Sequence, residues 1–533
     1  MANRNLFGST PIQVPNRSGF DLSHENMLTL KCGQLVPVMT DLLIPGDRVS
    51  VGSAFEVQLP PMATDFYGRV RFKMEAFFVP CRLLYGGWQK FMTSPTGNNA
   101  PFATSVSSLL PFCVVPAENA TVLGRGSLAD YLGYKGTINT RQRINNILRF
   151  MAYHKIYDDW YRDSRIQKPV FDEAVPVSSA ATSLSVATLP FQGVNGSSTL
   201  TYGTATKFAD GVDLFAIRQR NWARDYFTNA TPLPQAGTGA SLSFDVAENS
   251  GSFTIASLRA ANSLQQWLER NNIAGNRYAD QIKAHFGVMP ADAVTQRAIY
   301  LGSSSSVIYN HSVYQTVGVD GSVVSSSNPF TTVGAKFSSP IGSDKSSLVG
   351  DFSVTEFGYL MIIGSIVPDA IYATGINRDF FRLQIGDFAF PLLQGVGDQP
   401  IYKAELANVG VDGDSMDSMA TFGYTQRFAE YKYMEDEVHG GLCDGQSLSA
   451  FALKRSFGGL PQTALGSSFL EIPVDYLDGV AAADTAVASD YGAWADIFFQ
   501  YRKTSVLSAY TIPTLGDPHN THIETVPTGG RRL

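Results

Sequence analysis

Hydrophobic and polar residues alternate most regularly in residues 68–80, which read G-R-V-R-F-K-M-E-A-F-F-V-P. One set of alternate positions is apolar: Val70, Phe72, Met74, Ala76 and Phe78. The positions between them are charged: Arg69, Arg71, Lys73 and Glu75. A period of two is typical of a β-strand, because successive side chains point to opposite faces. The pattern predicts a strand with one buried face and one wet or interfacial face.

Other strand candidates are scattered over the whole chain. They are residues 27–39, 359–367, 422–433 and 494–501. Turn-forming Gly, Pro and Asp residues separate them. This scatter favours antiparallel pairing between distant segments, as in a sandwich with Greek-key connections, over a repeating βαβ order. We therefore expect an all-β fold.

Two stretches have the spacing of helices. Residues 144–160 begin with apolar positions three and four apart, and residues 257–286 carry a similar stripe with a break at Gly275. We expect helical insertions at 138–168 and 256–287. Three stretches rich in Ser, Thr, Gly and Val are expected to be exposed loops or small excursions: 175–211, 238–252 and 303–347. With no repeat and no sharp break in composition, we expect one domain over residues 1–533, with terminal arms at 1–26 and 514–533.

The charge content changes this picture. Asp, Glu, Lys and Arg make up 16% of the 533 residues, whereas soluble domains average about 25%. Such a protein exposes an unusually neutral surface or covers much of its surface against other copies. With 40 Lys and Arg against 47 Asp and Glu, the net charge is −7. That balance excludes the overall basic excess of histone-like proteins, so any contact with nucleic acid must be local.

Cysteines and the N-terminus indicate where the protein is made. The four cysteines lie far apart without a C-x-x-C pair, which favours free thiols in a reducing compartment. The N-terminal residues lack an apolar signal-peptide core. The most apolar stretch, residues 357–368, is shorter than the roughly 20 residues that span a bilayer. We expect a protein that stays in the cytosol unless lysis releases it.

Motifs of catalysis or cofactor binding are not found. The sequence has no phosphate-binding glycine loop, no G-x-S-x-G and no H-E-x-x-H. For His24, a ring Nε2 that is hydrogen-bonded to a nearby loop is favoured over a catalytic role. A late cluster has ligand-like chemistry, although a polar tail is favoured over a metal site: Asp517, His519, His522 and Glu524. Another resembles the start of a calcium loop but lacks its downstream Glu: Asp412, Asp414 and Asp417. We expect no enzyme, no cofactor and no metal.

Two segments combine cations with aromatic residues, a mixture that suits single-stranded nucleic acid. The same residue types are enriched at subunit interfaces, and we favour that interpretation. The interface candidates are Trp160, Tyr161, Arg220, Trp222 and Arg224. The candidates for facing DNA, which include arginines of the two chain ends, are Arg4, Arg17, Arg162, Arg165, Lys168, Arg531 and Arg532.

A series of short motifs resembles the major capsid proteins of microviruses, the small tailless phages with single-stranded DNA genomes, and most of all their gokushovirus-like branch. The early motifs are G-Q-L-V-P-V-M-T-D-L-L-I-P-G-D at 33–47, F-F-V-P-C-R-L at 77–83 and Y-H-K-I-Y-D-D-W-Y-R-D at 153–163. The later ones are D-Y-F-T at 225–228, R-Y-A-D-Q-I-K-A-H-F-G at 277–287, F-G-Y-T-Q-R-F-A-E-Y-K-Y at 422–433 and S-A-Y-T-I-P at 508–513. Together they cover nearly the whole chain.

The resemblance implies an eight-stranded antiparallel viral jelly roll with long loop insertions and a few helices. It implies pentamers that close into a T=1 icosahedral shell around circular single-stranded DNA, in the virion after assembly in the host cytoplasm. The implied partners are copies of the chain, the genome, a small basic DNA-packaging protein, a minor or pilot capsid protein and a host cell-surface receptor. Similar proteins carry a long insertion where this chain has only residues 238–252, which argues against a large threefold spike and leaves residues 175–211 as candidate decoration.

Two other functions compete with the capsid reading. An extracellular glycan-binding β-sandwich would fit the many aromatic residues, but it predicts an export signal. A hydrolase with an unusual site would place its chemistry at His24 or at His519 and His522. The capsid hypothesis accounts best for the low charge, the dispersed strands and the ordered motifs.

Overall fold

The computed structural model describes most of the chain except several connecting segments and both ends. The described residues are 17–59, 67–85, 88, 92, 110, 113–115, 123–135, 142–170, 186–193, 196–203, 214–234, parts of 259–271, 277–312 without 293, 333–338, 347–407 without 374 and 396, 420–457, 465–477 and 492–509. Strands predominate in this part, and all pairs between named strands are antiparallel. The expected all-β antiparallel architecture is confirmed.

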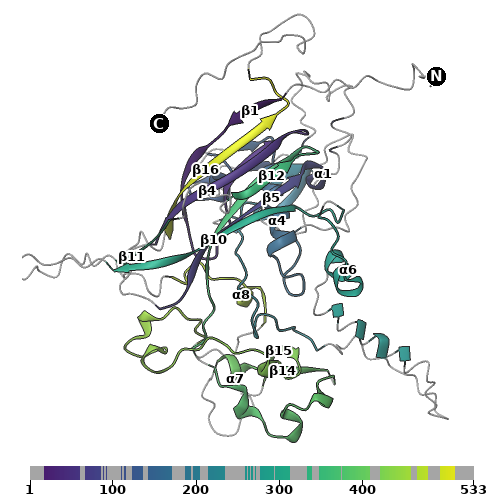
Figure 1. Ribbon diagram of the computed structural model, residues 1–533, viewed down its shortest axis with the longest axis vertical. Helices are drawn as coiled ribbons and strands as arrows, with labels where there is room; N and C mark the ends of the chain where they lie inside the picture. The colour runs from purple at the N-terminus through teal and green to yellow at the C-terminus, as the bar shows by residue number, and fades with distance from the viewer. Residues whose placement is uncertain are drawn as a thin grey trace, which may run out of the picture.

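Ten strands form the main sheet (Figure 1). They are β1 Ser18–Asp21, β2 His24–Leu30, β3 Val36–Leu43, β4 Arg48–Gln58, β5 Val70–Pro80, β10 Ile299–Ser312, β11 Val333–Ser338, β12 Ser347–Ser353, β13 Gly358–Pro368 and β16 Ala493–Ser505. Within it, the pairings run β2-β16-β4-β12 on one side and β3-β13-β5-β10 on the other. Strand β11 pairs with both β4 and β10 and so joins the two groups.

The two groups of strands face each other across one hydrophobic core. The apolar positions of the predicted strand at 68–80 all point into it, as do residues of β2, β3, β4, β10, β12, β13 and β16. The Phe72 ring of β5 meets the Phe55 ring of β4 edge to face at 5.0 Å. The ring of Phe78 lies 5.3 Å from that of Phe352 in β12. The apolar positions that alternate in the sequence thus form a core between the two groups of strands.

The opposite face of β5 and β13 carries a second core. Its lid is α4, Leu148–Ile156, of which eight residues are buried, followed by a π-helical turn, η3 Tyr157–Tyr161. Phe77 and Val79 of β5 point into this core. The face of β5 that the sequence predicts to be wet or interfacial is therefore covered by the subunit's own helix toward its C-terminal end. The helix expected within 144–160 is confirmed from Leu148 onward.

The short remaining elements complete the fold. There are two small sheets. One pairs β14 Asp398–Tyr402 with β15 Thr421–Gln426. In the other, the strands lie in the order β7 Gln142–Ile144, β6 Cys113–Val115, β9 Gly196–Gly203 and β8 Val186–Gly193. The helices and turns are α1 Cys81–Leu84, α3 Leu128–Tyr131, α6 Tyr278–Phe286, η5 Arg378–Phe381, η6 Ile385–Asp387, η7 Pro391–Leu393, α7 Lys403–Leu406, η9 Ala429–Tyr431, η10 Gly440–Leu442, η11 Ser449–Phe451 and α8 Ser467–Leu470. No helix among the described residues is long and apolar enough to cross a membrane.

Strands β14 and β15, with α7, lie at the far end of the molecule from β1, and α8 lies between them and the main sheet (Figure 1). A third hydrophobic core holds this end together, and its largest members include Phe227, Tyr372, Phe422 and Phe469. We call this part, residues 370–457 with 465–470, the distal lobe.

Several sequence expectations differ from the structure. The predicted strand at 27–39 is two strands, because the chain turns at Gly33 with a φ of 71° and a Cβ there would stand 2.7 Å from Ile472. The strand predicted at 422–433 ends at Gln426 and gives way to η9. Residues 175–211 and 303–347, expected to be loops, contain β8, β9, most of β10, and β11. Strand β9 and residues 303–306 of β10 are rich in Ser and Thr and lack the apolar alternation that reveals a strand, whereas β8 and β11 carry only three alternating apolar positions each. Part of the expected arm 1–26 is paired with β16, and residues 238–252 lie outside the described residues.

Candidate functional site

The basic and aromatic residues selected from the sequence meet around one hollow of about 340 Å³. Its lining includes all five interface candidates: Trp160, Tyr161, Arg220, Trp222 and Arg224. Segments about 60 residues apart therefore form one site. Arg277, just before α6, also lines it and was missed by sequence reasoning. It donates to backbone carbonyls of Asp158, Asp159 and Arg162 and so ties α6 to the end of η3.

A buried carboxylate on β5 organises the hollow. Arg220 donates from Nη1 to Oε2 of Glu75 at 2.7 Å and to Oγ of Ser365 at 3.1 Å. The hydroxyl of Tyr161 donates to the same carboxylate oxygen at 2.6 Å, and Lys73 pairs with its other oxygen at 2.7 Å. Burial opposes the ionised form of Glu75, but Arg220 and Lys73 outweigh it and lower the pKa to about 2. Tyr161 and Arg220 thus connect the segments that carry them to β5 of the same subunit.

Two candidates for DNA contact are also occupied within the subunit. Arg162 donates from Nε to Asp158 at 2.5 Å and from Nη1 to the carbonyl of Gln167 at 2.9 Å. Arg165 pairs with Asp163 at 2.8 Å. Their side chains are only 10% and 5% exposed. An arginine buried and paired in this way has little surface left for a phosphate, so the arrangement gives the DNA prediction for these two no support.

The other candidates divide into anchored and exposed groups. Trp160 donates to the carbonyl of Ala298 at 2.8 Å, and Trp222 is buried beneath the guanidinium of Arg455, 4.7 Å from its ring centre. Arg224, by contrast, is 58% exposed and 3.8 Å from Asp163. Two DNA candidates, Arg17 and Lys168, are exposed. Three lie outside the described residues: Arg4, Arg531 and Arg532.

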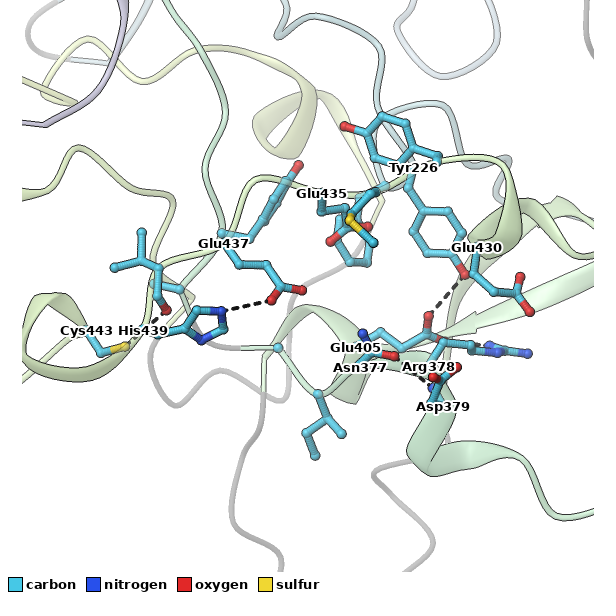
Figure 2. A pocket seen from close by; sticks show the side chains of 18 of the residues that line it. Tyr226, Asn377, Arg378, Asp379, Glu405, Glu430, Glu435, Glu437, His439 and Cys443 are labelled. Atoms are coloured by element: carbon cyan, nitrogen blue, oxygen red, sulfur yellow. Dashed lines mark hydrogen bonds and ion pairs between the residues drawn. The ribbon is translucent and has the colours of Figure 1, made fainter.

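A second hollow, of about 400 Å³, lies in the distal lobe and is lined with carboxylates (Figure 2). On one side, Glu405 accepts from Arg378 at 2.5 Å and from the Tyr226 hydroxyl at 3.0 Å. On the other, Nε2 of His439 lies 3.2 Å from Glu437. Five labelled carboxylates thus line the hollow: Asp379, Glu405, Glu430, Glu435 and Glu437.

Glu435 is the electrostatically strained member of this group. Within the described part of the chain, no hydrogen bond or ion pair reaches its carboxylate. Burial raises its pKa to about 8, and the negative charges of Asp225, Glu405 and Glu437 add to the rise. The sequence signal was the acidic run E-D-E at 435–437, which carries no motif and gives no hint of the distant carboxylates that lie near Glu435.

In the described segments, no three His, Cys, Asp or Glu side chains are grouped so as to hold a metal ion. His24 is exposed, with Nδ1 2.9 Å from the carbonyl of Leu22. The clusters at 412–417 and 517–524 lie outside the described residues.

Comparison with known proteins assigns the chain first to a class, the structural proteins of viral shells. Residues 10–249 and 240–515 match the capsid protein (F protein) family of phages. This match covers far more than half of the sequence. The chain therefore belongs to the phage capsid protein (F protein) family.

Individual relatives agree with that assignment. The chain is 26% identical to capsid protein VP1 of Chlamydia phage 1, over 96% of this chain and 98% of the relative. It is 24% identical to capsid protein VP1 of Bdellovibrio phage phiMH2K over the same shares. It is 24% identical to capsid protein VP1 of Spiroplasma virus 4, over 85% of this chain and 87% of the relative. All three are microviruses. The predicted microvirus resemblance is confirmed: the chain has the function of a major capsid protein, which assembles in many copies and is a component of the virion.

Proposed function

We propose that this major capsid protein closes into a T=1 icosahedral shell, built from pentamers, around the circular single-stranded DNA of a phage. The observation that carries the proposal is the capsid family match, which extends from residue 10 to residue 515. Closed point-group symmetry limits growth to one particle size, since each copy buries the same surfaces against its neighbours. The shell needs no chemistry from the subunit.

The proposed core of the subunit is an eight-stranded viral jelly roll. The two groups of the main sheet contain eight strands, which are, numbered in chain order, β2, β3, β4, β5, β10, β12, β13 and β16. One group then has the order 1-8-3-6 and the other 2-7-4-5. Two four-stranded groups in this interleaved order are what two Greek keys produce when a sheet rolls up, which supports the proposal. Within the single proposed domain, residues 138–168 and 256–287 are insertions.

The proposed contact with DNA is limited and uses the exposed cations. Arg17 and Lys168 are exposed, and the proposed terminal arms contribute Arg4, Arg531 and Arg532. A chain with net charge −7 does not neutralise a genome by itself. We therefore assign most of the counter-charge to a small basic packaging protein. A minor or pilot protein and a host receptor complete the proposed partners.

Assembly is tested directly by expressing the chain with and without its phage partners. Sedimentation and electron microscopy of the product should show closed particles of one size, and a reconstruction should place sixty copies in each particle, the number that a T=1 shell requires. A protein that stays monomeric even beside its phage partners, or that forms open sheets or tubes, contradicts the proposal.

A further inference from the structure

Large apolar side chains are concentrated on one exposed segment of the distal lobe, residues 378–393, which we call the apolar segment. Six of its side chains are 46% to 91% exposed: Phe380, Leu383, Ile385, Phe388, Phe390 and Leu392. None of them enters any of the three hydrophobic cores. The backbone of the segment belongs to the end of the molecule opposite β1 (Figure 1). The segment contributes little to the stability of its own subunit.

The backbone of the apolar segment is nevertheless held firmly. It consists of three short turns, η5, η6 and η7. The carboxylate of Asp387 accepts from the backbone N–H of Leu383 at 2.9 Å and of Gln384 at 2.8 Å. Arg427 donates to the carbonyl of Gly386 at 2.8 Å. A segment fixed by its own polar groups presents its apolar side chains in a set arrangement, which lowers the entropy cost of binding.

Charged residues around the apolar segment are satisfied inside the subunit. Arg382 pairs with Asp379 at 2.8 Å and lies near Glu430 at 3.9 Å. Its guanidinium also stacks between two aromatic rings, 5.6 Å from the centre of Phe388 and 4.6 Å from that of Tyr431. Arg378 pairs with Glu405. What remains to meet a partner is therefore apolar and aromatic, which suits a protein surface better than a sugar or a phosphate.

The exposed area is large for a subunit that stands alone. At roughly 200 Å² for each ring, the three Phe residues alone expose on the order of 350 Å², and the Leu and Ile residues add to it. The largest apolar patch of a typical monomer covers about 300–600 Å². A stable interface covers about 800 Å² on each partner, with an apolar centre rich in aromatic residues and Arg. The apolar segment has the size and composition of such a centre.

We propose that the apolar segment, together with Tyr431, binds a second copy of this chain in the assembled shell. The inference rests on the proposed function, because a shell protein surrounds itself with copies of itself. It deepens that function by naming which surface is buried when subunits associate. Covering these side chains also accounts for the internal pairing of the neighbouring charges, since an unpaired charge would oppose burial.

The test compares two double variants of the full chain, expressed with its phage partners. Leu383→Glu with Leu392→Glu places two charges on the apolar segment, whereas Leu383→Met with Leu392→Met keeps it apolar. Because both leucines are at least 74% exposed, neither pair should change the thermal unfolding of the isolated subunit. We expect the Glu pair to reduce the yield of closed particles at least tenfold by sedimentation and electron microscopy, and the Met pair to assemble like the unchanged protein.

Each other outcome has a defined meaning. Normal particle yield from the Glu pair overturns the inference, and so does normal yield combined with lost adsorption to host cells, which would assign the segment to a receptor. Reduced thermal stability of the Glu pair as an isolated subunit also overturns it, because the segment would then be covered by its own chain. If the unchanged protein forms no particles, the proposed function itself fails, and the inference fails with it.

Discussion

Glu75 is the residue on which the basic and aromatic hollow depends. It accepts from Arg220 and Tyr161 and pairs with Lys73, and the residue is only 8% exposed. Removing one partner of a buried ion pair leaves the other charge without compensation. Tyr161 and Arg220, which the sequence suggests as interface residues, thus make their contacts inside the subunit and stabilise its fold.

Glu75→Gln should destabilise the subunit by about 3–5 kcal/mol, because Arg220 then remains buried without a carboxylate. The pKa of Glu75 falls from an ordinary value of 4.5 to about 2 in the folded state. Its contribution is therefore complete above pH 4.5 and is lost as pH falls toward 2. Urea unfolding at several pH values measures both effects. Equal stability of the two proteins at pH 7 would contradict the assignment.

Glu435 should produce the opposite pH dependence. Burial and neighbouring carboxylates raise its pKa from 4.5 to about 8, so the folded state keeps a proton that the unfolded state has lost. The free energy of unfolding should therefore decrease as pH rises from 4.5 to 8. Glu435→Gln should remove this slope and raise the melting temperature at pH 8 by a few degrees, on the order expected for 1 kcal/mol. Identical slopes in calorimetry would refute the prediction.

At this scale, the residue types of one site were predictable and their partners were not. The sequence selected Tyr161 and Arg220, but Glu75 lies 145 residues from Arg220 and was noticed only as part of the polar face of a strand. Pairing at such a distance depends on how the sheet folds. The distal hollow gave even less signal, because Glu435 gains its properties only from burial beside Asp225 and Glu405.

Strands β10 and β12 belong to different groups of strands, and their backbones approach closely at Gly302. A Cβ on Gly302 in β10 would lie 2.2 Å from the carbonyl oxygen of Leu348 in β12. Gly302 also sits at the one irregularity in the pairing of β10 with β5. A backbone oxygen cannot move aside as a flexible side chain can. Only glycine therefore fits at position 302 without a steric clash.

Gly302→Ala should lower the free energy of unfolding by about 1–3 kcal/mol, the usual cost of overpacking. Gly350 in β12 is the matched control, since a Cβ there would meet nothing within 4 Å. Gly350→Ala should be neutral or slightly stabilising, because alanine restricts the unfolded chain. Urea unfolding of the two variants compares them directly. Equal losses at both positions would mean that β10 and β12 are not in close contact.

Elements with a strong apolar pattern were predictable from the sequence, and those without it were not. The alternation in β5 and the apolar run of β13 both predicted strands that the structure contains. Strand β9 consists largely of Ser, Thr and Gly, and β8 and β11 carry only three alternating apolar positions each. What defines these strands is backbone pairing with neighbours. The order of the strands was also beyond sequence periodicity, since periodicity identifies a strand but not its partner.

For the whole molecule, the low charge content takes on a specific meaning. Many of the charges that do exist are used within the subunit, as in the pairs of Arg162 with Asp158 and Arg378 with Glu405. Part of the surface is left apolar, as the apolar segment shows most clearly. In a shell, neighbouring subunits would cover such a surface. Exposed cations such as Arg17 and Lys168 then remain the proposed places for contact with DNA.

Two sets of arginine variants should separate DNA binding from folding. Replacing Arg4, Arg17, Arg531 and Arg532 by Ala should leave the total particle yield unchanged and lower the fraction of DNA-filled particles, since each lost phosphate contact weakens binding and its salt dependence. Arg162→Ala with Arg165→Ala should instead destabilise the isolated subunit by about 3–5 kcal/mol, because Asp158 and Asp163 lose their buried partners, and should reduce filled and empty particles alike.

Density-gradient separation of filled and empty particles, with thermal unfolding of the subunits, distinguishes the two results. The matched control for lost surface charge is Arg48→Ala with Arg125→Ala, two exposed arginines that pair with Asp351 and Asp130 within the subunit. This control should leave the filled fraction as it is, because those cations are already neutralised. The terminal set removes four charges and this control removes two. If the filled fraction falls equally for each charge removed in the two sets, DNA responds to total charge and not to the arms. If the Arg162 and Arg165 pair lowers only the filled fraction, those two residues reach the genome despite their burial in the subunit.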